Sequence, residues 1–137
     1  MIFVDTSFFL ALWSSRDPDH SRARDVFESL SDRRLGDLLL TTNHVVFETM
    51  TLARRRAGLE LALGAGERLY GEKMARIHWA TPDEEKAAFA YMGKYRDKHY
   101  SPVDCLSFVV MEKLGITEAL TLDGDFAHRF IARPGPG

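Results

Sequence analysis

Cysteine is nearly absent from this sequence, and its scarcity limits the chemistry that the chain can carry. Cys105 is the one cysteine among 137 residues. An intrachain disulfide is therefore impossible, and a structural zinc site built on several thiolates is excluded. We expect the Cys105 side chain to be inert packing in an apolar helix. A lone thiol is also typical of a protein from a reducing compartment.

Long apolar runs are missing as well. The first residues, MIFVDTSFFLALW, are mostly apolar, but Asp5 interrupts them early and no basic leader precedes them. We therefore do not expect a signal peptide. No run approaches the roughly 20 apolar residues that span a bilayer. These features predict a cytoplasmic protein without a membrane partner.

An excess of basic residues is also lacking, since the formal net charge is -2. Most nucleic-acid-binding domains are basic, so the overall charge alone argues against that function. Cations bound to clustered carboxylates would offset much of the acidic charge, however, and would leave the remaining surface near neutral. The densest basic run is Arg54, Arg55 and Arg56, which we expect to guide the phosphates of a nucleic acid. The five histidines show no metal-ligand spacing, so a zinc site is not expected.

Short apolar runs alternate with helical patterns from end to end. The expected strands cover residues 2–4, 38–42, 76–80 and 119–122, and beyond Phe130 only Ile131 and Ala132 have strand character. The expected helices cover 6–13, a segment opened by Asp17-Pro18 up to residue 30, 43–57 with Asn43 as cap, 59–70, a segment from Thr81-Pro82, 101–115 and 126–130.

This alternation predicts an α/β fold, a three-layer α/β/α sandwich around a mostly parallel sheet of four or five short strands. We expect a single domain over residues 1–132 and a flexible tail over 133–137, where the sequence reads RPGPG.

Four acids fall where such a sheet binds ligands, which is beyond the carboxyl ends of its strands. Asp5 and Asp123 each end an expected strand, Glu48 lies in the second turn of a helix, and Asp104 lies in the first turn of another. Asp104 also suits a helix start and Asp123-Gly124 suits a turn, so each alone has a structural explanation. Asp5 and Glu48 have no such explanation, because a carboxylate among apolar neighbours needs a charged partner. A crowd of carboxylates stays ionised only around a cation, and Mg²⁺ prefers oxygen ligands.

The segments MIFVDTSFFLAL, the isolated Glu48, YSPVDCLSFVVMEKLGI and ALTLDGDF resemble the four signature segments of PIN domains, closest to VapC-type toxins of prokaryotic toxin–antitoxin pairs. The resemblance runs from Met1 to about Arg129. It implies a PIN-like fold and a Mg²⁺- or Mn²⁺-dependent endoribonuclease.

The resemblance also assigns roles to residues. It implies Asp5, Glu48, Asp104 and Asp123 as the catalytic quartet, with the metal on Asp5, Asp104 and Asp123. It implies supporting roles for Ser7 and Thr121, and a secondary one for Asp125. A homodimer, a cognate antitoxin and a structured RNA substrate such as tRNA or rRNA are implied as partners.

Three other functions fit parts of this pattern. The first is a catalytically inactive RNA-binding or regulatory PIN module, which the retention of all four acids opposes. The second is a small-phosphoester phosphatase, but Asp5-Thr6-Ser7 lacks the second aspartate that such enzymes usually carry two residues later. The third is a DNA nuclease, which usually has extra helices that clamp a duplex.

Overall fold

The protein is a five-stranded parallel sheet between two layers of helices, in a computed structural model that describes residues 1–30 and 34–137. The strands are β1 (Ile2–Val4), β2 (Leu39–Thr42), β3 (Arg76–His78), β4 (Glu118–Thr121) and β5 (Ile131–Pro134). Their spatial order is β3-β2-β1-β4-β5, and every neighbouring pair is parallel. The predicted α/β/α sandwich is confirmed, with five strands.

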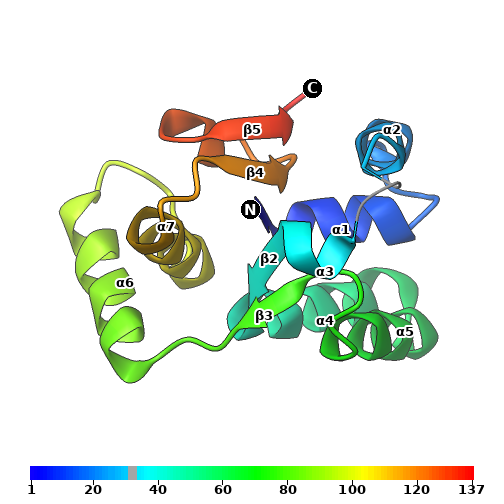
Figure 1. Cartoon of the computed structure of the whole chain (residues 1–137), viewed down its shortest axis with the longest axis horizontal. Coiled ribbons are helices and arrows are strands. Elements are labelled where there is room, and N and C mark those ends of the chain that lie inside the picture. The colour runs from blue at the N-terminus through cyan, green and yellow to red at the C-terminus, as the bar shows by residue number, and fades with distance from the viewer. Residues whose placement is uncertain (31–33) are drawn as a thin grey trace.

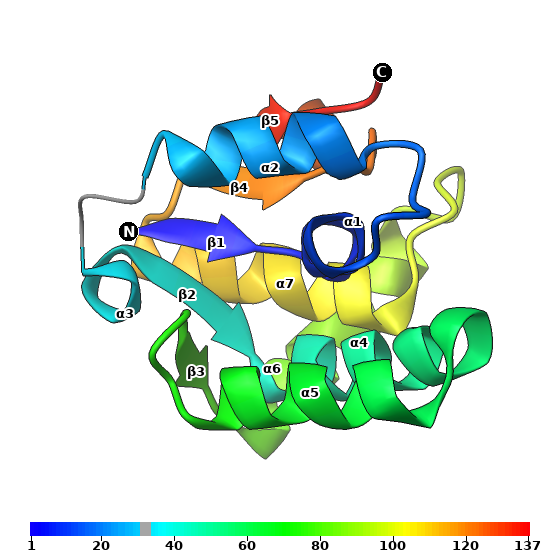
Figure 2. The same cartoon turned by 90° about the vertical axis from the view of Figure 1, so that its right-hand side faces the viewer.

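Helices cover both faces of this sheet. They are α1 (Thr6–Trp13), α2 (His20–Glu28), α3 (Leu35–Leu38), α4 (Asn43–Ala57), α5 (Leu59–Tyr70), α6 (Pro82–Lys94), α7 (Pro102–Leu114) and the 3-10 helix η1 (Phe126–His128). In Figure 1, α6 and α7 lie on one side of the sheet, and α1, α2, α4 and α5 lie on the other. Figure 2 shows that α1 starts directly where β1 ends. Among the described residues, no helix is long and apolar enough to cross a membrane.

The end of the chain differs from the expected loose tail. Arg133 and Pro134 belong to β5, which pairs with β4 over the whole length of both strands. The guanidinium of Arg22, on α2, donates hydrogen bonds to the carbonyl oxygens of Pro134 and Gly135 at 3.3 and 3.0 Å. A proline at the edge of a sheet loses no ladder hydrogen bond on its solvent side. The expected tail therefore begins with the last two residues of an edge strand, Arg133 and Pro134.

Helix boundaries also differ in detail from the sequence prediction. Asp17-Pro18 does not open α2; the Asp17 carboxylate accepts the backbone N–H of Asp19 in a turn, and the helix begins at His20. The cap of α4 is Thr42, whose hydroxyl accepts the N–H of Val45 at 3.1 Å. Asn43, the expected cap, instead accepts the N–H of Ala80 and ties α4 to the segment that follows β3. The short helix α3 was not predicted.

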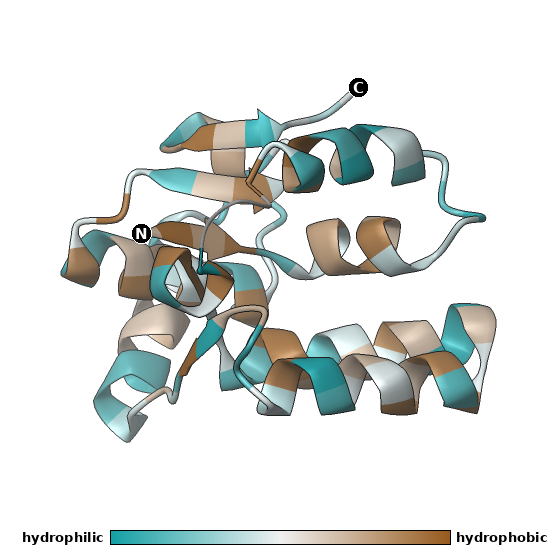
Figure 3. Cartoon of the chain, turned by 45° about the vertical axis from the view of Figure 1, so that its right-hand side comes forward, coloured by the Kyte–Doolittle hydropathy of each residue, from teal (hydrophilic) through white to brown (hydrophobic). Residues whose placement is uncertain are grey.

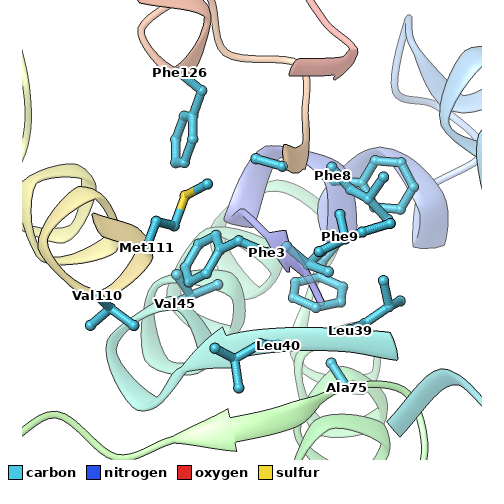
Figure 4. Packing of buried hydrophobic residues seen from close by; sticks show 14 of the residues in the cluster. Phe3, Phe8, Phe9, Leu39, Leu40, Val45, Ala75, Val110, Met111 and Phe126 are labelled. Carbon is cyan, nitrogen blue, oxygen red and sulfur yellow. The ribbon is translucent and has the colours of Figure 1, made fainter. Parts of the chain in front are cut away.

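The core consists of the sheet and the helix faces that pack on it. Figure 4 shows Phe3 from β1 among Phe9, Val45 and Met111, and each of these four side chains is at most 1% exposed. In Figure 3 the strand that starts at the N-terminus is hydrophobic throughout, as expected when both faces of a sheet are covered. Apolar burial fixes β1, and β1 in turn fixes the position of Asp5.

One glycine has a packing role that the sequence did not reveal. Gly66 weakens α5 by propensity alone, yet α5 forms over its full predicted length. A Cβ atom at Gly66 would lie 2.8 Å from the Sδ atom of Met50 on α4. The missing side chain therefore lets α4 and α5 pack closely. Glu48 is carried by α4, so this packing helps to place it.

A buried acid joins β3, α6 and α7. The Glu84 carboxylate is 4% exposed and accepts hydrogen bonds from the Thr81 backbone, from His78 and, at 3.1 Å, from Lys113. Burial opposes the charge, but these three donors outweigh it and lower the pKa of Glu84 to about 2. The network fixes the start of α6 and packs it against α7.

We expect Glu84→Ala to lower the free energy of unfolding by about 1.5–3 kcal/mol, because His78, Lys113 and the Thr81 backbone lose the buried charged acceptor that they share. Urea denaturation at pH 7 measures this loss. The matched control is Glu85→Ala, which removes a half-exposed carboxylate that pairs with His44 at 2.7 Å. That change should cost less than about 1 kcal/mol. Equal losses in the two variants would contradict the role given to Glu84.

Candidate active site

A small cavity at the carboxyl edge of the sheet contains all four acids predicted from the sequence. Its volume is about 180 Å³. Its walls are formed by Asp5, Thr6, Ser7, Leu10, Glu48, Leu52, Arg56, Asp104 and Asp123. The acids come from the end of β1, the second turn of α4, the first turn of α7 and the end of β4. Parallel strands and helix starts thus gather residues that are far apart along the chain.

Asp5 is held by two hydroxyl groups. It is 3% exposed, and its Oδ2 atom accepts hydrogen bonds from Ser7 at 2.9 Å and from Thr121 at 3.0 Å. Burial raises the pKa of Asp5 to about 6, helped by the charge of Asp123 and opposed by the two hydroxyls. The predicted supporting residues Ser7 and Thr121 therefore lie directly against the first acid. Neither hydroxyl bonds to the other carboxylate oxygen, Oδ1.

Asp104 is fixed by the start of its own helix. The Ser101 hydroxyl accepts the N–H of Asp104, and Asp104 Oδ2 accepts the N–H of Ser101, both at 3.1 Å. This capping box orients the Asp104 side chain. Burial raises the pKa of Asp104 to about 7, followed by the charges of Asp5 and Asp123. Asp104 is thus both a helix cap and a member of the acidic cluster.

Asp123 is fixed by the turn after β4. Its backbone N–H donates to Thr121 Oγ1, and its Oδ1 atom accepts the N–H of Asp125 at 2.9 Å. Burial raises its pKa, as does the charge of Asp125. Carboxylate oxygens of Asp104, Asp123 and Asp125 lie within 4.8 Å of one another. Asp125, given a secondary role from the sequence, is therefore grouped more tightly with these acids than expected.

The fourth acid, Glu48, is half-buried on α4 and lines the same cavity. Within the described residues its carboxylate forms no hydrogen bond or ion pair. Asp5, Asp104 and Asp123 each commit one named oxygen to a fixed hydrogen bond. Side chains that are oriented by one oxygen and keep the other for a ligand are typical of preorganised metal sites.

The donor set fits a hard divalent cation. All candidate ligands are carboxylate oxygens, which Mg²⁺ and Mn²⁺ prefer. Burial is the main cause of the raised pKa values of Asp5 and Asp104, and a bound dication would favour the ionised form of both carboxylates. Thr6 Oγ1, on another residue of the cavity wall, is the one buried side-chain polar atom in the described part of the chain without a hydrogen-bond partner. A bound ion with its waters would complete such a cavity.

Of the three arginines singled out from the sequence, one lines the acidic cavity. Arg56 lines the acidic cavity, whereas Arg54 and Arg55 are exposed on α4 and do not line it. Cys105 is fully buried, as predicted. Trp13 packs against Phe9, with ring centroids 5.1 Å apart.

Arg56 also lines a second cavity of about 520 Å³, which it shares with Trp13 and Arg16. Sequence reasoning missed this neighbour of the acidic cavity. No motif predicts that the turn after α1 folds against the end of α4.

Comparison with known proteins supports the resemblance seen in the sequence. The PIN domain family matches residues 2–129. The chain is 39% identical to the 23S rRNA-specific endonuclease VapC20 of Mycobacterium tuberculosis over 127 residues, which cover 93% of this chain and 92% of the relative. It is 26% identical to the ribonuclease VapC26 of the same species over 122 residues, 89% of this chain and 86% of that one.

Solved structures show the same relationship. The crystal structure of M. tuberculosis VapC20, described as a sarcin-ricin loop cleaving toxin, superposes with a TM-score of 0.84. The identity there is 36%, over 93% of this chain and 94% of that one. A toxin–antitoxin complex from Klebsiella pneumoniae superposes with a TM-score of 0.61 at 14% identity, over 90% of this chain and 87% of that one, and shows the shared fold.

Proposed function

This chain belongs to the PIN-domain family and is a relative of its VapC endonucleases, and on that premise we propose that it is a metal-dependent endoribonuclease. The reaction is hydrolysis of phosphodiester bonds in RNA. One observation carries the proposal: Asp5, Glu48 and Asp104 line a single cavity with Asp123, although they come from four distant segments. A chance arrangement of buried acids would be strongly destabilising.

We assign the metal to Asp5, Asp104 and Asp123, with Mg²⁺ or Mn²⁺ as the ion. When bound, such an ion lowers the pKa of water and offsets charge on a phosphodiester. The protein's own groups prepare this chemistry. Ser7 and Thr121 hold Asp5 in one rotamer, and the capping box does the same for Asp104. Low exposure of these carboxylates strengthens their attraction to a cation.

Glu48 has a different proposed role. It lines the cavity from α4, whereas the other three carboxylates follow or cap other elements, and it has no fixed partner among the described residues. A carboxylate in this position accepts a proton from the attacking water or positions that water by a hydrogen bond. Asp125, whose backbone N–H orients Asp123, is assigned a supporting role.

The substrate and partners follow from the relatives. VapC20 is named for cleavage of 23S rRNA, and we propose a structured RNA, ribosomal RNA or tRNA, for this chain. The VapC20 structure is described as that of a toxin. We accordingly propose that this protein is the toxin of a toxin–antitoxin pair, acts in the cytoplasm, and is held inactive by a cognate antitoxin. We also propose a homodimer, which exposed apolar side chains such as Phe47 on α4 and Phe89 on α6 would favour.

A nuclease assay tests the proposed function. Purified protein, freed of any partner, is incubated with RNA, single-stranded DNA or p-nitrophenyl phosphate, in Mn²⁺ or in EDTA. We expect cleavage of RNA alone, only with metal. RNA binding without cleavage in Mn²⁺ would instead favour the inactive RNA-binding module. Hydrolysis of the small phosphoester would favour a phosphatase, and cleavage of the DNA would favour a DNA nuclease.

The three arginines of α4 give a matched test of substrate binding. Arg56 lines the acidic cavity, while Arg54 lies two residues earlier and does not. We expect Arg56→Glu to lower kcat/KM for RNA by about 10–100-fold and to reduce its salt dependence, because one phosphate contact is lost. Arg54→Glu, with the same change in net charge, should have a much smaller effect. Equal effects would mean that net charge alone matters.

A further inference from the structure

A second basic surface lies in the segment that leads to the start of α7, the helix that carries Asp104. It is formed by the segment between α6 and α7, residues 95–100, together with His128 at the end of η1. Arg96, Lys98 and His99 are exposed there, and His128 is exposed beside them. In Figure 2 this segment, the turn between α4 and α5, and the carboxyl ends of the strands all lie toward the same side of the molecule. We call the four exposed residues Arg96, Lys98, His99 and His128 the α6–α7 rim.

The rim is tied directly to the acids. The segment ends at Ser101, which caps the helix that carries Asp104. Tyr100 precedes Ser101, and its hydroxyl is hydrogen-bonded to His128 Nδ1 at 2.9 Å. His128 ends η1, and the residue before η1 is Asp125, whose carboxylate is grouped with those of Asp104 and Asp123. The rim therefore borders the acidic cavity rather than a remote face.

The charges of Arg96 and Lys98 are not used inside the protein. Arg96 donates to the carbonyl oxygen of Gly93, which is uncharged, and Lys98 lies 3.9 Å from its exposed neighbour Asp97. Both contacts leave the cations available to solvent. Arg129 differs, because it bonds the hydroxyls of Tyr91 and Tyr95 and lies 3.4 Å from Glu112. Arg129 thus holds the rings of Tyr91 and Tyr95 in place, and we do not include it in the rim.

This inference rests on the proposed endoribonuclease function. We propose that the α6–α7 rim binds the RNA backbone on the far side of the scissile bond, so that the strand crosses the acidic cavity from Arg56 to Arg96 and Lys98. A cavity lined by acids repels phosphate wherever a cation is absent, so the flanking phosphates need their own basic contacts. A single-stranded stretch of a structured RNA, such as a loop, fits best, since an exposed rim can follow its flexible backbone.

Binding and cleavage are measured separately to test this. A fluorescein-labelled single-stranded RNA is titrated with the Asp5→Asn protein, which should not cleave, and anisotropy is recorded over a range of salt concentrations. The test variant adds Arg96→Glu and Lys98→Glu. The control adds Arg34→Glu and Lys73→Glu, an equal change in charge at exposed positions that precede β2 and β3 and therefore lie at the amino edge of the sheet.

We expect the rim variant to bind RNA at least about 10-fold more weakly at low salt. Its dependence of log K on log salt should be shallower by about 1.4, the value for two lost contacts to a single strand. The control should stay within about twofold of its parent. In the cleaving protein, the rim variant should raise KM and leave kcat nearly unchanged. Equal losses in rim and control variants, or no loss in either, would overturn the proposal.

The two proposals fail in different ways. If the protein cleaves no RNA but the rim variant alone loses affinity, the rim stands as an RNA-binding surface and the nuclease function fails. If RNA is cleaved and the rim variant keeps both its affinity and its KM, the nuclease function stands and the rim proposal fails. In that second case the rim is free to meet a protein partner instead.

Discussion

Asp104→Asn is expected to lower RNA cleavage by about three orders of magnitude or more and, at the same time, to make the metal-free protein more stable. Asparagine can still accept the N–H of Ser101 through its amide oxygen, so the start of α7 should remain intact. The substitution removes a charge that is buried beside Asp5 and Asp123. At pH 8 in EDTA we expect the free energy of unfolding to rise by about 1–3 kcal/mol.

Opposite signs for activity and stability separate a site residue from a structural one. Cleavage is followed on an end-labelled RNA in Mn²⁺, and stability by urea denaturation in EDTA. The matched control is Asp83→Asn, an exposed acid in the first turn of α6, which should change neither quantity by much. If Asp104→Asn cleaves RNA at the rate of the unmodified protein, Asp104 is not part of the active site. If it unfolds more easily in EDTA, its charge serves the fold.

The sequence predicted the fold well where local signals and burial agree. β1 was assigned correctly because Ile2, Phe3 and Val4 are followed at once by an acid. The helix starts at Thr81 and Ser101 were predicted from the sequence, and the structure shows that each is a capping box. These signals depend on a few neighbouring residues, so tertiary contacts do little to alter them. The placement of the acids at one edge followed from the parallel order of the strands.

Errors arose where contacts between distant segments decide the structure. β5 exists because β4 offers it an unpaired edge and Arg22 binds its end, and neither fact is visible in RPGPG. Asn43 was predicted to cap α4, but its side chain instead accepts a hydrogen bond from the backbone N–H of Ala80, 37 residues away. The short distance between the carboxylates of Asp125 and Asp104 is likewise a contact between distant segments, which the sequence did not predict.

A pH dependence of stability without metal is the second large effect that we expect. The pKa values of Asp5 and Asp104 in the folded protein, about 6 and about 7, both lie above the ordinary value of 3.8. Between these limits the folded state binds more protons than the unfolded state. The stability that the two acids contribute is therefore complete below about pH 4 and is lost as the pH rises through 6 and 7. Glu84, whose pKa is lowered to about 2, contributes the opposite slope only below about pH 4.5, outside this window.

In EDTA we expect the free energy of unfolding to fall by about 2–4 kcal/mol between pH 5 and pH 8, from roughly 1.4 kcal/mol per unit of pKa shift with allowance for coupling of the two acids. The Asp5→Asn/Asp104→Asn double variant should show a much flatter profile. Saturating Mg²⁺ should restore stability at pH 8 but not at pH 5, because the ion competes with protons for the same oxygens. A flat profile in the unmodified protein, or an equal slope in the double variant, would mean that these carboxylates do not share a buried site. Because the cavity that destabilises the metal-free protein is the one that binds the ion, activity and metal-dependent stability should rise together over the same range of pH.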